Sequence, residues 1–176
     1  MIVLLRGLPG SGKSALAQSL APRIHAVILN KDLVRAALFP GETTEYTTAQ
    51  DDFVIGLMLQ ATQYHLERNR NVILDGRTHG RAAQVELVRG FAARIGAKCL
   101  VVECLCRPET ALRRIEADLA AGTHPAKNRD AALLRDQLAK WETIEGWVCQ
   151  VDGEGPLQQA VNTVAQHVLI GEDHAR

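Results

Sequence analysis

The eight residues from Gly7 to Ser14 restrict the possible folds of this chain more than any other part of it. They read GLPGSGKS and match the pattern G-x-x-x-x-G-K-[ST] at every fixed position. An apolar run at residues 1–6 precedes the pattern, and a helical spacing of apolar residues at 13–20 follows it. Glycines let main-chain N–H groups wrap around phosphate oxygens, and a helix N-terminus adds partial positive charge. The run therefore predicts a phosphate-binding loop between a strand and a helix.

Every residue of this loop is a candidate ligand of a nucleotide, and two have distinct expected roles. Lys13 is expected to reach the β- and γ-phosphates, and the Ser14 hydroxyl is expected to bind Mg²⁺. The expected cofactors are therefore ATP and Mg²⁺. The predicted nucleotide-binding residues are Gly7, Leu8, Pro9, Gly10, Ser11, Gly12, Lys13 and Ser14.

Apolar runs and helical patterns alternate along the rest of the chain. Buried strands are predicted at residues 1–6, 25–29, 71–75, 98–105 and 146–151. Helices are predicted at residues 13–20, from residue 31 or 32 to the Pro40-Gly41 pair, from after Thr48 to Leu66, and at residues 82–95, 108–119, 130–141 and 156–169. Apolar strands separated by helices are typical of a parallel sheet covered on both faces. The sequence therefore predicts an α/β fold, a three-layer α/β/α sandwich with a five-stranded parallel sheet and a small helical lid at about residues 110–136.

Composition narrows the class of protein. The chain has 176 residues, of which 47% are apolar and 23% charged, which predicts one soluble globular domain over residues 1–176. No apolar run reaches the roughly 18 residues of a membrane helix, and the start is too short for a signal peptide. Four cysteines do not form a disulfide framework in a chain of this size, so we expect a protein of the reducing cytoplasm with buried cysteines.

The charges balance overall but are unevenly distributed. Twenty Lys and Arg residues oppose twenty Asp and Glu residues, which argues against an extended nucleic-acid surface. Residues 1–40 carry five basic residues and one acid, a net charge of +4, whereas residues 41–64 carry four acids and no base. Residues 141–176 have a net charge of −5, from six acids and one base. An anionic ligand is therefore expected near the phosphate loop.

A family resemblance rests on three segments. The loop at residues 7–14, the sequence DLVR at 32–35 and the sequence VILD at 72–75 together resemble the small P-loop kinases. The nearest branch is the polynucleotide-kinase-like one among AAA-family ATPases, with relatives such as chloramphenicol phosphotransferase, gluconate kinase, shikimate kinase and zeta-toxin-like kinases. The similarity spans most of residues 1–140. It implies a P-loop NTPase fold and transfer of the γ-phosphate of ATP to a hydroxyl group.

Asp32 is the candidate general base. It follows the second predicted strand, at the sheet edge where ligands collect in α/β folds, and a carboxylate there can accept a hydroxyl proton. In the resembling kinases this aspartate is the proposed base. The alternative is that Asp32 only caps the following helix. The resemblance makes Arg35, one turn later, a ligand of an anionic or polar group on the acceptor, and the alternative is a solvated arginine.

The third strand supplies the next candidates. Asp75 stands at its end, in the Walker-B position, and is expected to help hold Mg²⁺; the alternative is an Asx-turn residue before Gly76. Arg77 and His79 follow, and each is either an acceptor contact or a loop residue. Arg77 is the substrate-binding candidate among them.

The predicted lid has to bring arginines to the transferred phosphate. The resemblance places such an arginine at Arg114, with Arg113 more typical of a solvent-facing helix residue. A second arginine is often found four residues later, where this chain has Asp118, so Arg129 is the candidate substitute. Without a substitute, the transition-state charge is under-compensated. The loop at residues 152–156 is the candidate adenine contact.

Two function classes follow. The first is an ATP-dependent kinase, for which Asp32 is the discriminating residue; the second is a regulatory NTPase with weak hydrolysis and no acceptor, which Asp118 favours. The neutral charge favours a small hydroxylated acceptor. A short nucleic-acid 5′ end stays open, because Arg35, Arg77 and Arg81 can bind one phosphate. Nothing in the sequence indicates an obligate protein partner.

Overall fold

The computed structural model describes residues 1–122 and 130–173, and within them five strands form one parallel sheet. The strand order is β2-β3-β1-β4-β5, with β1 at the centre. Val3 of β1 pairs with Ile73 on one side and with Leu100 on the other. The predicted parallel α/β fold is therefore confirmed. The strands are β1 (Ile2–Arg6), β2 (Ala26–Asn30), β3 (Asn71–Asp75), β4 (Cys99–Leu105) and β5 (Cys149–Asp152).

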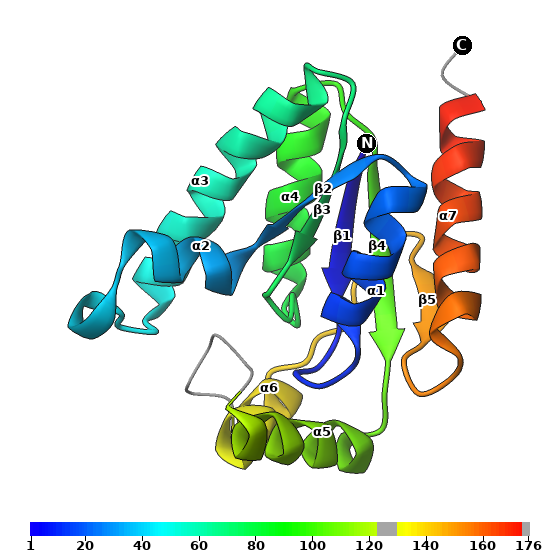
Figure 1. Ribbon diagram of the computed structural model, residues 1–176. Helices are drawn as coiled ribbons and strands as arrows, with labels where there is room; N and C mark the ends of the chain where they lie inside the picture. The colour runs from blue at the N-terminus through cyan, green and yellow to red at the C-terminus, as the bar shows by residue number, and fades with distance from the viewer. Residues whose placement is uncertain (123–129, 174–176) are drawn as a thin grey trace.

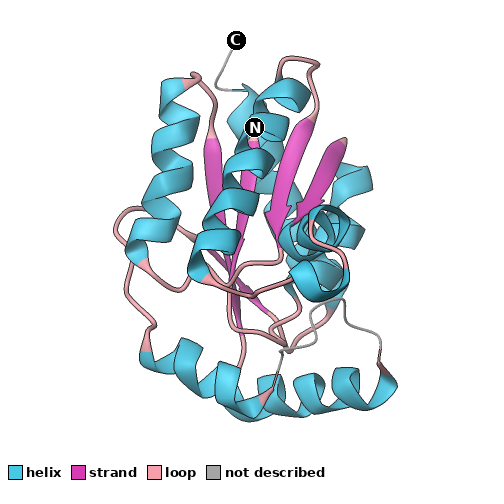
Figure 2. Ribbon diagram, turned by 90° about the vertical axis from the view of Figure 1, so that its left-hand side faces the viewer, coloured by secondary structure: helices cyan, strands magenta, loops and turns pink. Residues whose placement is uncertain are grey.

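Helices cover both faces of the sheet and also its lower end (Figure 1). Helices α1 and α7 lie on one face and α3 and α4 on the other, while α5 and α6 lie below the carboxyl ends of the strands in both views (Figure 1; Figure 2). Short 3₁₀ turns follow α1 and α2. The helices are α1 (Lys13–Leu20), α2 (Lys31–Leu38), α3 (Thr48–Leu66), α4 (Ala82–Arg94), α5 (Pro108–Ala121), α6 (Ala131–Ala139) and α7 (Leu157–Asp173), and the 3₁₀ turns are Ala21–Arg23 and Gly41–Thr43.

Two apolar cores result from the alternation of side chains along the strands. Val3 and Leu5 of β1 pack with α1 and α7, whereas Ile2 and Leu4 pack with α3 and α4. All four side chains are 0% exposed. The central strand is thus apolar on both faces, as expected for a parallel sheet between helical layers.

Side-chain caps fix where several helices begin. Asn30 caps α2, because its Oδ1 accepts hydrogen bonds from the main-chain N–H groups of Asp32 and Leu33 at 3.0 and 3.1 Å. The alternative that Asp32 is the helix cap is therefore wrong. Asp130 caps α6 by accepting from the Leu133 N–H at 2.7 Å.

The fifth strand is shorter than predicted. It begins at Cys149, not at residue 146, since Gly146 adopts a φ of 77° and the chain there is irregular. Arg89 of α4 donates hydrogen bonds to the carbonyl groups of Glu145 and Trp147. These carbonyl groups are therefore satisfied by a side chain and not by the main chain of a neighbouring strand. No helix within residues 1–122 and 130–173 is both long and apolar enough to cross a membrane.

Candidate nucleotide and acceptor site

A cavity of about 820 Å³ lies at the carboxyl end of the sheet. The phosphate loop forms one wall, and residues that follow β2, β3 and β5 form others, with α5 and α6 beneath. The structure brings most of the sequence-predicted site residues to this one cavity. They are Lys13, Ser14, Asp32, Arg35, Asp75, Arg77 and Arg114.

The phosphate loop is held in a fixed shape by glycines and by Lys13. Gly10 and Gly12 have φ values of 80° and 91°, in the left-handed region that favours glycine. A Cβ at Gly10 would lie 2.5 Å from the carbonyl oxygen of Ala111, so α5 packs directly on this loop. The Lys13 Nζ donates to the carbonyl oxygens of Gly7 and Leu8, each at 2.8 Å, and the side chain is buried. The lysine is therefore positioned inside the loop, at the start of α1.

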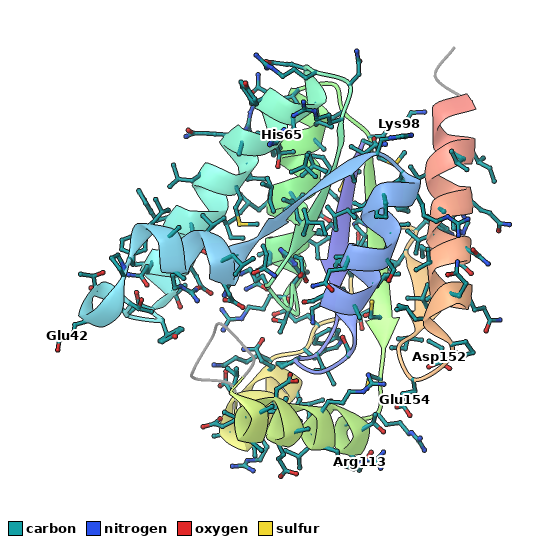
Figure 3. The ribbon with its side chains drawn as sticks, viewed as in Figure 1. Glu42, His65, Lys98, Arg113, Asp152 and Glu154 are labelled. Atoms are coloured by element: carbon teal, nitrogen blue, oxygen red, sulfur yellow. The ribbon has the colours of Figure 1, made fainter. Side chains whose placement is uncertain are left out.

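Arg114 joins three parts of the site. Its Nη1 donates to the carbonyl oxygens of Gly10 in the phosphate loop and Gly153 in the loop after β5, at 3.1 and 2.9 Å. A Cβ at Gly153 would overlap the carbonyl oxygen of Ser11, so these two loops are in direct contact. Arg113 is exposed, lies on the outer side of α5 (Figure 3) and donates to the Thr110 hydroxyl, as expected for a solvent-facing residue.

Glu154, which the sequence reasoning missed, fixes the loop after β5 to the start of α5. Its Oε1 accepts from the main-chain N–H of Arg107, and its Oε2 accepts from the Arg107 guanidinium, both at 2.6 Å. These hydrogen bonds lower the pKa of the Glu154 carboxyl to about 2. Figure 3 shows Asp152 at the end of β5 and Glu154 below it, near the start of α5. The sequence carries only a weak signal for the contact, an acid in a glycine-rich turn.

Asp75 has the environment of a metal-binding carboxylate. It is 2% exposed, and its Oδ2 accepts from Asn30 Nδ2 at 2.8 Å. Among the described residues, its buried Oδ1 has no hydrogen-bond partner, and neither oxygen forms an Asx turn with Gly76. An unpaired buried carboxylate oxygen is costly unless a ligand satisfies it. Ser14 presents its exposed hydroxyl to the same cavity, so two oxygen donors suited to Mg²⁺ face one space.

Asp32 and Arg35 contact each other and two further charged residues. The Arg35 Nη1 lies 3.1 Å from Asp32 Oδ1, and the Lys31 Nζ lies 3.6 Å from the same oxygen. Lys31 also donates to Asp51 Oδ2 at 3.0 Å, and Arg35 pairs with Asp51 through Nη2. Burial lowers the pKa of the Lys31 ammonium from 10.5 to about 8, which still leaves it charged at pH 7. The solvated-arginine alternative is wrong for Arg35, which is 3% exposed.

Arg77 lies in the same cavity and pairs with a residue of α3. Its Nη2 is 2.9 Å from Asp52 Oδ1. The sequence did not indicate Asp51 or Asp52 as site residues, because it does not show how α3 is oriented against α2. Arg81 is exposed and lines the cavity, as does Asp118.

His79 does not line the cavity, so of its two alternatives the structure favours a loop residue over an acceptor contact. Its imidazole is 2% exposed, and Nδ1 lies 3.0 Å from the carbonyl oxygen of Leu5. Burial lowers the pKa of His79 from 6.5 to about 3.

Arg6, at the end of β1, forms a buried contact that the sequence reasoning also missed. Its Nε lies 2.8 Å from Glu103 Oε1, and Nη1 donates to the His79 carbonyl at 3.0 Å. Its guanidinium stacks on Trp141 at 4.3 Å, and Nη2 donates to the Glu142 carbonyl. The segment after α6 is therefore held against the end of the central strand.

The remaining predicted residues divide into two groups. Arg129 lies outside the described residues. The cysteines are free; Cys104 and Cys149 are buried, as predicted, whereas Cys99 and Cys106 are partly exposed. Burial raises the pKa of the Cys104 thiol to about 12, so this thiol stays protonated at neutral pH.

Solved structures with the same fold include several kinases. A provisionally assigned kinase from Chloroflexus aurantiacus is similar with a TM-score of 0.75 and 19% identity, over 94% of this chain and 97% of that one. A gluconokinase from Sinorhizobium meliloti gives a TM-score of 0.70 and 16% identity, over 98% and 94%. The APS kinase CysC of Mycobacterium tuberculosis, in complex with AMPPNP and APS, gives 0.70 and 18%, over 96% of each chain. At these identities the likeness shows the fold, which is that of P-loop kinases.

The chain is also similar in sequence to curated proteins and to one protein family. Uncharacterized proteins of Mycobacterium tuberculosis and Mycobacterium bovis are 29% identical over 177 residues, which covers 95% of this chain and 34% of theirs. The chain thus spans about a third of the length of these relatives. Residues 2–144 match the family described as AAA domain, and this match covers most of the chain. The chain therefore belongs to the AAA domain family and has the fold of its P-loop kinase-like members.

Proposed function

We propose that the protein is an ATP-dependent kinase that transfers the γ-phosphate to a hydroxyl group of a small molecule. One observation carries the proposal: Asp32 does not serve as the cap of α2 and instead lines the same cavity as Lys13 and Ser14. An NTPase that only changes shape needs no carboxylate at this place. The kinase folds among the solved structures support the same activity.

The nucleotide half of the cavity consists of the phosphate loop, Lys13 and Arg114. The positive end of α1 and the Lys13 ammonium bind the β- and γ-phosphates. The Arg114 guanidinium, held at the loop by Gly10 and Gly153, neutralises charge on the transferred group. Ser14 and the unpaired Asp75 Oδ1 fit a Mg²⁺ ion, which would neutralise phosphate charge when bound.

Asp32 activates the acceptor. Its contacts with Lys31 and Arg35 both use Oδ1, which leaves Oδ2 to accept a proton. In the transfer step the acceptor oxygen forms a bond to the γ-phosphorus, and its proton moves to Asp32. The bond between the γ-phosphorus and the β,γ-bridging oxygen breaks, and ADP leaves. Arg35 and Lys31 hold the carboxylate in place during this step.

The second candidate, a regulatory NTPase without an acceptor, is favoured by Asp118. This carboxylate lines the cavity from α5, at a position where the resembling kinases often have an arginine. A negative charge there does not stabilise a transferring phosphoryl group.

The test combines two substitutions with two measurements. Asp32→Asn keeps the shape of the side chain and removes the base, so we expect phosphorylation of hydroxyl compounds to fall at least about 100-fold. AMPPNP binding, measured by calorimetry with Mg²⁺, should stay within about twofold because Asp32 does not touch the phosphate loop. Lys13→Ala should abolish AMPPNP binding. The exposed Glu42, outside the cavity, gives the control Glu42→Gln.

Two results would contradict the proposal. Unchanged phosphoryl transfer in Asp32→Asn would assign the base elsewhere. ATP hydrolysis that no hydroxyl compound stimulates, in a protein that binds AMPPNP normally, would favour the regulatory NTPase.

A further inference from the structure

The acceptor half of the cavity contains buried positive charges and an equal number of carboxylates. Its basic side chains come from α2 and the loop after β3, and its carboxylates come from α2 and α3. The basic residues are Lys31, Arg35 and Arg77, and the acidic residues are Asp32, Asp51 and Asp52. The formal charges of these six residues cancel, and the exposed Arg81 adds one positive charge to the lining.

Each of the three cations is already paired within the chain. Asp51 contacts both Lys31 and Arg35, and Asp52 contacts Arg77 at 2.9 Å. The three basic side chains are at most 10% exposed. An acceptor with a negative group would have to displace a carboxylate from these cations, because buried charges are stable only in pairs.

The carboxylates also lie nearer to solvent than the cations. The side chains of Asp51 and Asp52 are 22% and 56% exposed, whereas that of Arg35 is 4% exposed. A molecule that approaches past α3 therefore meets the negative charges of Asp51 and Asp52 before it reaches the buried positive charges of Lys31, Arg35 and Arg77. Repulsion at this rim acts against an anionic acceptor and leaves a neutral one unaffected.

We propose, on the basis of the kinase function above, that the acceptor is an uncharged polyhydroxylated molecule, and that Asp51 and Asp52 exclude acceptors with a carboxylate or phosphate group. Uncharged hydrogen-bonding side chains complete this half of the cavity: Tyr46, Thr48 and Gln84. Their hydroxyl and amide groups, together with carboxylate oxygens, are suited to a set of hydroxyl groups.

The same pairing argues against a nucleic-acid 5′ end as acceptor. The sequence left that acceptor open because Arg35, Arg77 and Arg81 can bind one phosphate, and the exposed Arg81 does line the cavity. In the structure Arg35 and Arg77 are paired with carboxylates, so a phosphate next to the 5′-hydroxyl would compete with Asp51 and Asp52 for these two arginines.

The first experiment measures anion binding without any need to know the acceptor. The protein is saturated with AMPPNP and Mg²⁺, which occupies the phosphate loop, and inorganic phosphate is then titrated by calorimetry. We expect no saturable phosphate binding up to about 10 mM in the native protein. Asp51→Asn uncovers Lys31 and Arg35 and should bind phosphate at least about tenfold more tightly than the native protein.

Two further variants serve as a second test and as a control for this experiment. Asp52→Asn removes a half-exposed partner of Arg77 and provides a second variant in case Asp51→Asn does not fold, which thermal unfolding will show. Glu42→Gln removes one exposed negative charge from the segment between α2 and α3, far from the sheet (Figure 3), and should leave phosphate binding unchanged. Saturable millimolar phosphate binding by the nucleotide-loaded native protein would overturn the inference.

The second experiment compares neutral hydroxyl compounds with anionic relatives of similar size that also carry free hydroxyl groups. Glucose is compared with gluconate, and uridine with uridine 5′-monophosphate, by mass spectrometry of the phosphorylated products. We expect the neutral member of a productive pair to be preferred at least about tenfold in kcat/KM, and Asp51→Asn or Asp52→Asn to reduce that preference. Preference for the anionic member contradicts the charge argument. If no acceptor is phosphorylated, the result counts against the kinase function. The phosphate titration still tests separately whether this half of the cavity excludes anions.

Discussion

Buried positive charge is the most unusual property of individual residues in this protein. Arg6, Lys13, Lys31, Arg35 and Arg77 are each at most 8% exposed. Burying a charge costs several kcal/mol unless it is paired, and each of these groups contacts a carboxylate or main-chain carbonyls. The four of these side chains that line the cavity, all except Arg6, are therefore fixed in position by contacts within the chain itself.

His79 should make the protein sensitive to acid. Its pKa is about 3 when folded and 6.5 when unfolded, so the unfolded chain binds more protons between these values. The contribution of the neutral imidazole to the free energy of unfolding is fully present above pH 6.5 and is lost as the pH falls towards 3. The free energy of unfolding then decreases by up to about 1.4 kcal/mol per pH unit.

The check uses urea unfolding at several pH values. In His79→Asn the amide can still donate to the Leu5 carbonyl, and asparagine tolerates the φ of 49° at this position. We expect the variant to be less stable at pH 7 but to lose less stability between pH 6.5 and 4. If the free energy of unfolding changes with pH in the same way in the native protein and the variant, His79 is not the group that titrates.

Among the helices and strands, the sequence predicted those with strong periodicity and missed contacts made between them. The first four strands and all seven helices lie close to their predicted positions, since each has an apolar face of the right period. The start of β5 was wrong because Arg89, a distant residue, satisfies the carbonyl groups there. The pairs Arg35–Asp51 and Arg77–Asp52 depend on how α3 packs beside α2, which no local pattern shows.

The contact between the loop after β5 and α5 depends on one carboxylate. We predict that Glu154→Gln speeds amide hydrogen exchange at Arg107 several-fold, because the charged acceptor of that N–H is lost. The unfolding midpoint should change little, since exposed ion pairs contribute little to stability. The Glu154 contact is fully present above pH 4.5 and is lost as the pH falls towards 2.

Exchange measured by mass spectrometry at neutral pH tests this prediction. Glu116→Gln removes an exposed carboxylate elsewhere on α5 and is the control. Equal exchange rates at Arg107 in both variants would show that α5 does not depend on Glu154.

The protein as a unit is built on two apolar cores separated by the sheet. Ile24 belongs to the core beneath α1 and α7, and Ile55 to the core beneath α3 and α4. We predict that Ile24→Val and Ile55→Val each reduce the free energy of unfolding by about 0.5–1.5 kcal/mol. The double variant should show the sum of the two effects to within about 0.5 kcal/mol, because the sites share no contacts.

Urea unfolding of the three variants gives this comparison directly. A coupling energy above about 1 kcal/mol would mean that the sheet transmits packing changes from one core to the other.

The two anchors at the lower end of the molecule limit how α5 and α6 can move. Glu154 attaches the start of α5, and Arg6, with Trp141 beneath it, attaches the chain just after α6. Arg114 adds attachments from the middle of α5 to Gly10 and Gly153. The described helices below the cavity are therefore joined to the carboxyl end of the sheet at several points, and Arg114 is kept beside the phosphate loop by contacts within the chain.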